Sequence, residues 1–346
     1  MTTLLLSGLA VTAAVCASLT AAVIPLLRRA RVVDVPGDRS LHRTPVPRGG
    51  GLAIVLAASL ATWTAVLAAV HLQGAVHAMS GVDVALMGLA TVLAFALLGL
   101  IEDLFSVSVR ARLVLQLVLG AGLGLVAHSA FEVSLWWTPA ICVGTAALVN
   151  ATNFMDGANG LACGHALLTS LWYVQVAAVA PVAGLGLVMV SVAGACLGFL
   201  PFNTPRAKVF LGDSGSYALG SAWAFAVTAC LSRGVAVEAA LAPVLVLLAD
   251  TGYTLWMRLR AGQCWYAPHR LHVYQRLVCA GWPHWASALL VTLAAASCSA
   301  LAASSLLTSN RLWMPQVAMA AVLIVYLKMP SIIGAPNPFP TLRRAR

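Results

Sequence analysis

The sequence predicts an all-α integral membrane protein that crosses the bilayer about eleven times. Hydrophobic residues make up 61% of its 346 residues, only 9% are charged, and the mean hydropathy is +0.93. A soluble globular domain carries roughly 25% charged residues. Runs without a charged residue, such as 49–82, 157–205 and 277–310, are each long enough for one or two membrane-spanning helices.

The spans are placed by these apolar runs and by the polar segments between them. The first, 3–27, has no positively charged segment before it, so it predicts a retained helix rather than a signal peptide. We expect a single transmembrane domain over 1–346. The other predicted spans are 51–71, 84–101, 111–128, 133–150, 161–180, 182–201, 215–232, 237–256, 286–306 and 312–328.

The basic residues predict the orientation. With the N-terminus in the periplasm, all but Arg233 and Arg311 of the 20 lysines and arginines fall on the cytoplasmic side, as the positive-inside rule requires. The prediction is a multi-pass protein of the bacterial inner membrane with a cytoplasmic C-terminus. The polar loops all fall on that same side, which favours chemistry on a cytoplasmic substrate, and they are 28–50, 102–112, 150–160, 202–215 and 257–285.

Composition also argues against two other classes. The net charge is +10, but the basic residues are divided among short loops without a soluble domain, which favours membrane lipids over nucleic acid as the partner. The eight cysteines contain no CxxC pair, which argues against a disulfide framework and a structural zinc site.

The loop 150–160 holds the most informative polar cluster. Asp156 is the only charged residue between 133 and 205, and Asn150, Asn153 and Asn159 surround it. In a soluble protein an Asx-rich turn would explain this pattern. Polar residues at membrane depth are costly, so a ligand or metal site is favoured here, and these oxygens suit Mg²⁺.

The two loops before it combine arginines with acids. In 28–50, Arg48 precedes three glycines, and the alternatives are contact with anionic lipid or close approach of the glycine backbone to an anionic ligand. In 102–112, Glu102 and Asp103 are neighbours on a helix and diverge by roughly 100°. They cannot face the same atom, so one of them is expected to be structural.

The last two polar loops also carry candidate ligand-binding groups. Asp213 lies in a Gly-Asp-Ser-Gly-Ser turn at the start of a span, where it could cap the helix or adjoin an anion site. Loop 257–285 contains His269, Arg270 and His272, which favour phosphate or sugar oxygens over zinc because the arginines repel a metal cation. Asp250 is an intramembrane carboxylate, either functional or in a buried salt bridge.

Taken in order, these loops resemble those of the polyprenyl-phosphate N-acetylhexosamine-1-phosphate transferases, the membrane glycosyltransferase family 4 that includes MraY and WecA. The resemblance covers nearly the whole chain from Asp34 to Leu277. Two segments, NTPRAKVFLGDSGS and PHRLHVYQRL, are most similar to the WecA and WbpL branch. One departure is Glu102, where the family has the first Asp of an Asp-Asp pair.

The resemblance implies an enzyme that transfers a HexNAc-1-phosphate from a UDP-HexNAc to undecaprenyl phosphate and releases UMP. The product would initiate O-antigen (lipopolysaccharide) or other cell-envelope glycan synthesis. It implies Mg²⁺ as cofactor, with Mn²⁺ as an alternative, and a homodimer as one assembly to test. Transport or flipping of a phosphorylated or nucleotide-linked compound is the alternative function, and it predicts polar residues on both membrane faces.

The resemblance also implies roles for individual residues. Asn153 and Asp213 match metal ligands, and Asp103 matches the acid that orients or deprotonates the lipid phosphate. The predicted catalytic residues are Asp103, Glu102 and Asp213. The predicted substrate-binding residues are Asp156, Asn159, Arg112, Lys208, His269, Arg270, His272 and Arg48.

Overall fold

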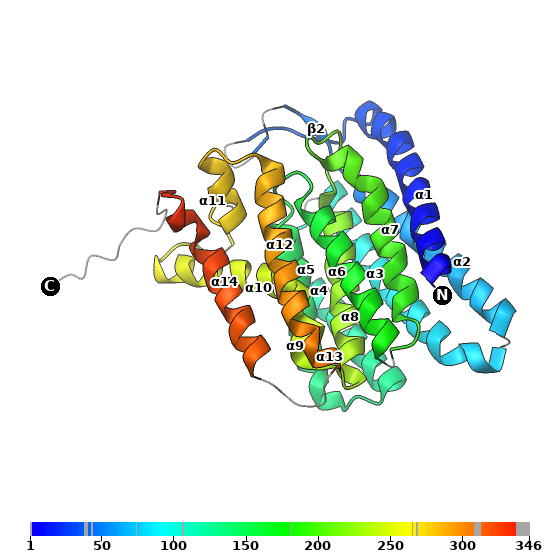
Figure 1. Cartoon of the computed structure of the whole chain (residues 1–346). Coiled ribbons are helices and arrows are strands. Elements are labelled where there is room, and N and C mark those ends of the chain that lie inside the picture. The colour runs from blue at the N-terminus through cyan, green and yellow to red at the C-terminus, as the bar shows by residue number, and fades with distance from the viewer. Residues whose placement is uncertain are drawn as a thin grey trace.

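The computed structural model describes residues 2–37, 41–42, 44–73, 75–105, 107–180, 182–264, 266–267, 269–307 and 313–336. Within them the chain forms a bundle of long helices, and the two strands β1 (Val33–Asp34) and β2 (Val46–Pro47) pair antiparallel at one end (Figure 1). Arg39 and Arg43 of the first polar loop, and the basic tail after residue 336, lie outside the described residues.

The helices account for nearly all of the described chain. Those of the first half are α1 (Thr2–Arg29), α2 (Gly51–Gln73), α3 (Ala75–Phe105), α4 (Val109–Phe131), η1 (Leu135–Trp137), α5 (Thr138–Phe154) and α6 (Leu161–Val179). Those of the second half are α7 (Leu185–Asn203), α8 (Gly212–Ser232), α9 (Val237–Leu241), η2 (Ala242–Val244), α10 (Leu245–Arg260), α11 (Val273–Cys279), α12 (His284–Ala302), α13 (Ser304–Leu307) and α14 (Met314–Ile332).

The all-α membrane class is confirmed. Nine helical stretches among the described residues are long and apolar enough to span a bilayer. The other two predicted spans coincide with α5, which has 17 residues, and with α8, which has 21 and begins with a polar turn. Every predicted span therefore overlaps a helix of the described residues, in which the backbone groups are satisfied internally as lipid requires. The count of eleven crossings stays a prediction.

Helix α8 is the centre of the bundle. Nearly all of its side chains are buried, and it packs against α2, α3 and α5. Glycines allow the close approach of its neighbours: a Cβ at Gly99 of α3 would lie 2.6 Å from the backbone nitrogen of Ser214. Small residues at such crossings are the usual means of tight packing between membrane helices. This packing fixes the position of the first turn of α8 relative to α2, α3 and α5.

The predicted span 237–256 falls within the stretch Val237–Arg260, which is long and apolar enough to span a bilayer but is not one continuous helix. The structure divides this stretch into α9, η2 and α10, with Pro243 inside η2. Proline has no N–H to donate and its ring clashes with the preceding turn, which breaks a regular helix. In Figure 1, α10 lies across the direction of its neighbours α12 and α14.

The polar loops meet at the end of the bundle where β2 lies (Figure 1). The residues that follow β2 pair with the loop that precedes α8: Phe210 N donates to Pro47 O at 2.8 Å, and Gly50 N donates to Phe210 O at 2.9 Å. This pairing joins two segments about 160 residues apart in the sequence and places Arg48 beside the first turn of α8.

Candidate active site

The start of α8 is fixed by the carboxylate of Asp103 at the end of α3. Its two oxygens accept hydrogen bonds from the backbone N–H groups of Asp213, at 3.0 Å, and Ser214, at 2.9 Å. A carboxylate at a helix N-terminus satisfies amides that have no partner within the helix. Gly212, with φ of 78°, lets the chain turn into the helix at this point. The Asp103 side chain is only 5% exposed, so both of its oxygens are committed to this contact.

Arg48 connects the two acids. Its Nε lies 3.0 Å from Asp103 Oδ1 and its Nη2 lies 2.6 Å from Asp213 Oδ2. The Arg48 side chain is still 39% exposed. A guanidinium has five donors, so Arg48 can hold both carboxylates and retain donors for an anion.

The three glycines after Arg48 have a structural role that the sequence did not reveal. The sequence left close approach of their backbone to an anionic ligand open, but the structure places protein atoms there. A Cβ at Gly50 would lie 2.7 Å from the Phe199 ring, and one at Gly51 would lie 2.5 Å from the backbone nitrogen of Gly215. Gly50 and Gly51 therefore allow α2 and the strand before it to pack against α7 and α8.

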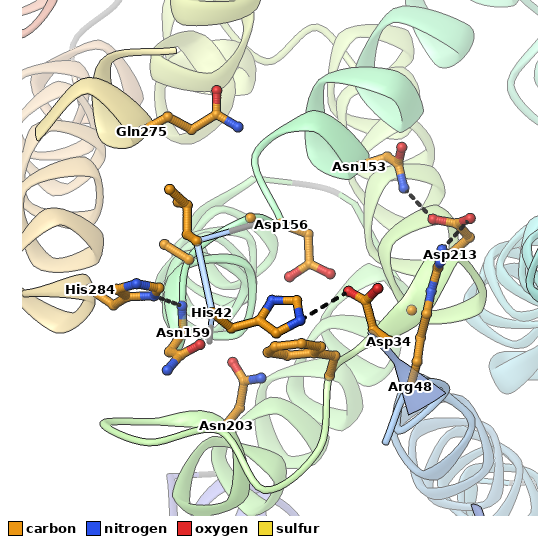
Figure 2. A pocket seen from close by; sticks show the side chains of 15 residues that line it. Asp34, His42, Arg48, Asn153, Asp156, Asn159, Asn203, Asp213, Gln275 and His284 are labelled. Carbon is orange, nitrogen blue, oxygen red and sulfur yellow. Dashed lines mark hydrogen bonds and ion pairs between the residues drawn. The ribbon is translucent and has the colours of Figure 1, made fainter. Parts of the chain in front are cut away.

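Asn153, in the last turn of α5, faces the same acid. Its Nδ2 donates to Asp213 Oδ1 at 2.7 Å and to Ser216 Oγ at 3.0 Å (Figure 2). Asp213 thus has Arg48 on one oxygen and Asn153 on the other, while its side chain keeps 14% exposure. The predicted pairing of Asn153 with Asp213 in one site agrees with this geometry.

A cavity of about 310 Å³ opens in front of these residues. Five predicted site residues line it: Arg48, Asn153, Asp156, Asn159 and Asp213. Its wall also contains Asp34, Leu41, His42, Gly157, Ala158, Asn203, Phe210, Gly212, Gln275 and His284. Figure 2 shows Asp156 near the middle of the cavity, between the Asp213 side and the His42 side.

The electrostatic environment of Asp156 differs from that of an ordinary surface carboxylate. Burial, and secondly the nearby charge of Asp213, raise its pKa well above its usual value, and Arg48 opposes the shift. A carboxylate whose charge is disfavoured in the empty site gains from a cation. This arrangement suits a residue that faces a metal ion or a ligand N–H donor.

We expect Asp156→Asn to raise the melting temperature of the ligand-free protein at pH 8. A raised pKa means that the charged side chain destabilises the fold above that pKa, and this cost fades as the pH falls through the raised pKa towards the unfolded value. The stability gap between variant and wild type should therefore shrink between pH 8 and pH 5. Melting curves in EDTA, with Asp83→Asn at the exposed far end of α3 as control, would check it. A gap that widens on acidification would contradict it.

Two other predicted residues form a pair of their own. Glu102 Oε1 lies 3.1 Å from Arg112 Nη1, and Glu102 Oε2 accepts from Val107 N at 3.1 Å. These bonds close the turn between α3 and α4. Within the described residues, neither side chain lines the cavity. Of the two neighbouring acids, Asp103 faces the start of α8 and Glu102 faces the α3–α4 turn, as their divergence on the helix predicts.

Two histidines of the last polar loop, His269 and His272, are not among the residues that line the cavity, whereas His284 is. His272 is only 2% exposed, and its Nδ1 lies 3.1 Å from Asp250. Desolvation first, and then His272 and Arg258, lower the pKa of His269 to about 4, so its ring is neutral near pH 7. His269 therefore does not supply the positive charge that an anion-binding role for both histidines would use.

The last two predicted substrate-binding residues, Arg270 and Lys208, are not among those that line the first cavity. Arg270 lines a second cavity of about 550 Å³ that shares Leu41, His42 and His284 with the first. Lys208 is exposed, and its Nζ lies 5.9 Å from the centre of the Phe202 ring. A part in substrate binding stays a prediction for both.

Several residues that line the cavity were not among the predicted site residues. Asn203 joins two loops, because its Oδ1 accepts from Gly160 N at 2.7 Å and its Nδ2 donates to Val209 O at 3.0 Å. His284 Nδ1 accepts from Asn159 N at 3.3 Å. Gln275 belongs to α11. Asn203 and His284 adjoin predicted cytoplasmic span ends and Gln275 lies within the polar loop 257–285, which was the available signal.

The fold and the cavity together define a polytopic membrane protein with a polar site, rich in acids, at one end of its helix bundle. Comparison with known proteins gives the family. Residues 85–231 match the model of glycosyl transferase family 4. The chain is 31% identical over 307 residues to decaprenyl-phosphate N-acetylglucosaminephosphotransferase of Mycobacterium leprae, covering 78% of this chain and 75% of that protein.

Two further relatives are similar to this chain. The probable undecaprenyl-phosphate N-acetylglucosaminyl 1-phosphate transferase of Bacillus subtilis is 27% identical, over 78% of this chain and 77% of that protein. The phospho-N-acetylmuramoyl-pentapeptide-transferase of Desulforudis audaxviator is 33% identical, over 57% of this chain and 68% of that protein. The chain belongs to glycosyl transferase family 4, the polyprenyl-phosphate N-acetylhexosamine-1-phosphate transferases.

Proposed function

We propose that the protein transfers an N-acetylhexosamine-1-phosphate from its UDP-sugar to undecaprenyl phosphate. A phosphate oxygen of the lipid forms a bond to the β-phosphorus, the bond from that phosphorus to the α–β bridging oxygen breaks, and UMP leaves. The observation that carries the proposal is the cluster of Arg48, Asn153, Asp156 and Asp213 around one cavity at a bundle end. Such a place is open both to a soluble nucleotide and to a lipid head.

The donor set of the cavity fits Mg²⁺. No group of three or more His, Cys, Asp or Glu side chains gathers for a metal among the described residues. Mg²⁺ needs few protein ligands, because it binds one or two carboxylates and completes its shell with water and substrate phosphates. Asp213 and the Asn153 oxygen would hold it, while Asp156 would face the UDP-sugar. When bound, the ion would neutralise charge on the phosphates during transfer.

Arg48 and Asp103 have different proposed roles in the reaction. Arg48 is placed to bind a phosphate oxygen from the side of Asp213. Asp103 touches backbone and Arg48 rather than the open cavity, so we assign it the positioning of α8 and not proton removal. The lipid phosphate needs no base near pH 7, since phosphate is already ionised there.

The reaction is tested with purified protein, Mg²⁺, undecaprenyl or decaprenyl phosphate and a panel of UDP-N-acetylhexosamines, with UMP release as the readout. We expect UMP release with at least one sugar, and the panel identifies which. Omission of the lipid is the control, because transfer needs an acceptor. The proposed function would be refuted if protein shown to be folded by its melting curve released no UMP with any of the sugars.

We further propose the bacterial inner membrane as the location, with the cavity on the cytoplasmic side and the product serving O-antigen or another envelope glycan. Cys264, before α11, and Cys279, its last residue, are both exposed in the polar loop 257–285. We expect a membrane-impermeant maleimide to label both in inside-out vesicles and neither in intact cells. Labelling from the outside would reverse the orientation.

A further inference from the structure

Asp250 is a buried acid that the proposed reaction does not use. It lies in α10, is 0% exposed, and accepts hydrogen bonds from two other segments of the chain, α14 and the start of α11. Tyr326 OH of α14 donates to its Oδ2 at 2.7 Å, and the Val273 N–H lies 3.1 Å from Oδ2 and 3.2 Å from Oδ1. The His272 Nδ1 also lies within hydrogen-bonding distance of Oδ1, at 3.1 Å.

These bonds fix the start of α11 against two helices. Val273 is the first residue of α11 and His272 is its N-cap. The side chain of Thr254, one turn further along α10, donates to Asp250 Oδ1 at 3.2 Å and helps to hold the carboxylate in place. Hydrogen bonds to a buried charged group are stronger than neutral ones, and losing them leaves the group unsatisfied. Asp250 thus serves as the anchor of α11.

Helix α11 in turn contacts the cavity. Gln275 lines the cavity wall, and its Oε1 accepts from His272 N at 3.2 Å. Tyr274, fully buried, donates from its OH to Phe154 O at 2.9 Å, where α5 ends and the Asp156 loop begins. A Cβ at Gly157 would collide with the Tyr274 hydroxyl, so the backbone of the Asp156 loop lies in close contact with α11.

We propose that Asp250, with Tyr326, is a positioning residue of the active site: it fixes α11, and α11 sets Gln275 and the Asp156 loop. This inference rests on the proposed function for its kinetic part. Residues Asp250, Val273 and Tyr326 all lie after the segment 85–231 that matches the family model. The opposite wall, with Arg48 and the start of α8, is held by contacts of its own to Asp103. Loss of the anchor should therefore weaken binding of the UDP-sugar more than it slows the chemical step.

The test uses full-length Asp250→Asn and Tyr326→Phe, with Tyr173→Phe as the matched control. Tyr173 is equally buried but donates to Ala240 O at 2.8 Å, away from α11. For Tyr326→Phe we expect amide exchange about tenfold faster in 273–279 and in the peptide 154–160, without a change in 212–220. We expect the KM for the UDP-sugar to rise about tenfold while kcat stays within about threefold. Tyr173→Phe should change neither.

The exchange and kinetic results together test the positioning role of Asp250. Unchanged exchange in 273–279 in the variants would overturn the anchor, and faster exchange confined to 273–279 with an unchanged KM would reduce it to a structural contact. If Asp250→Asn does not fold, Tyr326→Phe carries the test alone, because it removes one of several bonds. If wild-type protein releases no UMP with any sugar, the proposed function fails, and exchange in 154–160 alone supports or overturns the positioning.

Discussion

Asp213→Asn is expected to lower the rate of UMP release by about 10³-fold or more. Asp213 is the acid on which the candidate site converges: Arg48 contacts one oxygen at 2.6 Å, Asn153 the other at 2.7 Å, and the side chain faces the cavity. The amide retains the shape but loses the charge that would hold Mg²⁺ and balance Arg48. Since phosphoryl transfer depends mainly on positioning and charge stabilisation, little activity should survive.

Two substitutions on α3 serve as comparisons for Asp213→Asn. Asp103→Asn should also be severe, because an amide nitrogen would face the N–H groups of Asp213 and Ser214. Asp83→Asn, at the opposite end of α3, should leave turnover unchanged. The assay is UMP release at saturating UDP-sugar, with a melting curve of each variant in detergent to show that it is folded. Near wild-type turnover in a folded Asp213→Asn protein would refute the assignment of the site.

The parts of the fold and the site that are encoded locally could be predicted. Apolar runs marked the helices because lipid forces the backbone into internal hydrogen bonds, whatever the tertiary contacts. Likewise Asn153, Asp156 and Asp213 stood out as polar groups in apolar surroundings, and the structure places all three on one cavity.

The contacts between distant segments could not be predicted in the same way. Asp103 bonds to Asp213 N and Arg48 to Asp213, across gaps of 110 and 165 residues, and no local pattern encodes such a pairing. For the same reason the sequence left open whether the loop with glycines 49–51 meets anionic lipid or lets the backbone approach an anionic ligand, and it could not show that Gly50 and Gly51 face α7 and α8. Gln275 lies on the cavity wall because of contacts between α11 and distant parts of the chain, among them those with Asp250 of α10 and Phe154 of α5.

Gly99→Ala is expected to lower both the stability and the activity of the protein, although it adds one methyl group. Its Cβ would lie 2.5 Å from the carbonyl carbon of Asp213 and 2.6 Å from Ser214 N, with the Asp213 oxygen closer still. These are backbone atoms, so relief requires α3 and α8 to separate. Overpacking of this kind costs about 1 to 3 kcal/mol. A displacement near 1 Å at a catalytic group can cost about 10²-fold in rate.

The effect should reach activity because Gly99 lies one helical turn before Asp103, which holds the start of α8. The control is Gly122→Ala in α4, where the added Cβ meets no atom within 4 Å, so stability should stay the same or rise slightly. Melting temperature and kcat are measured for both variants. Gly99→Ala keeps every polar group of the site. A loss of kcat in protein that still folds at the assay temperature would therefore show that the position of α8 relative to α3 affects turnover. A Gly99→Ala protein with wild-type stability and kcat would mean that the two backbones are not in close contact.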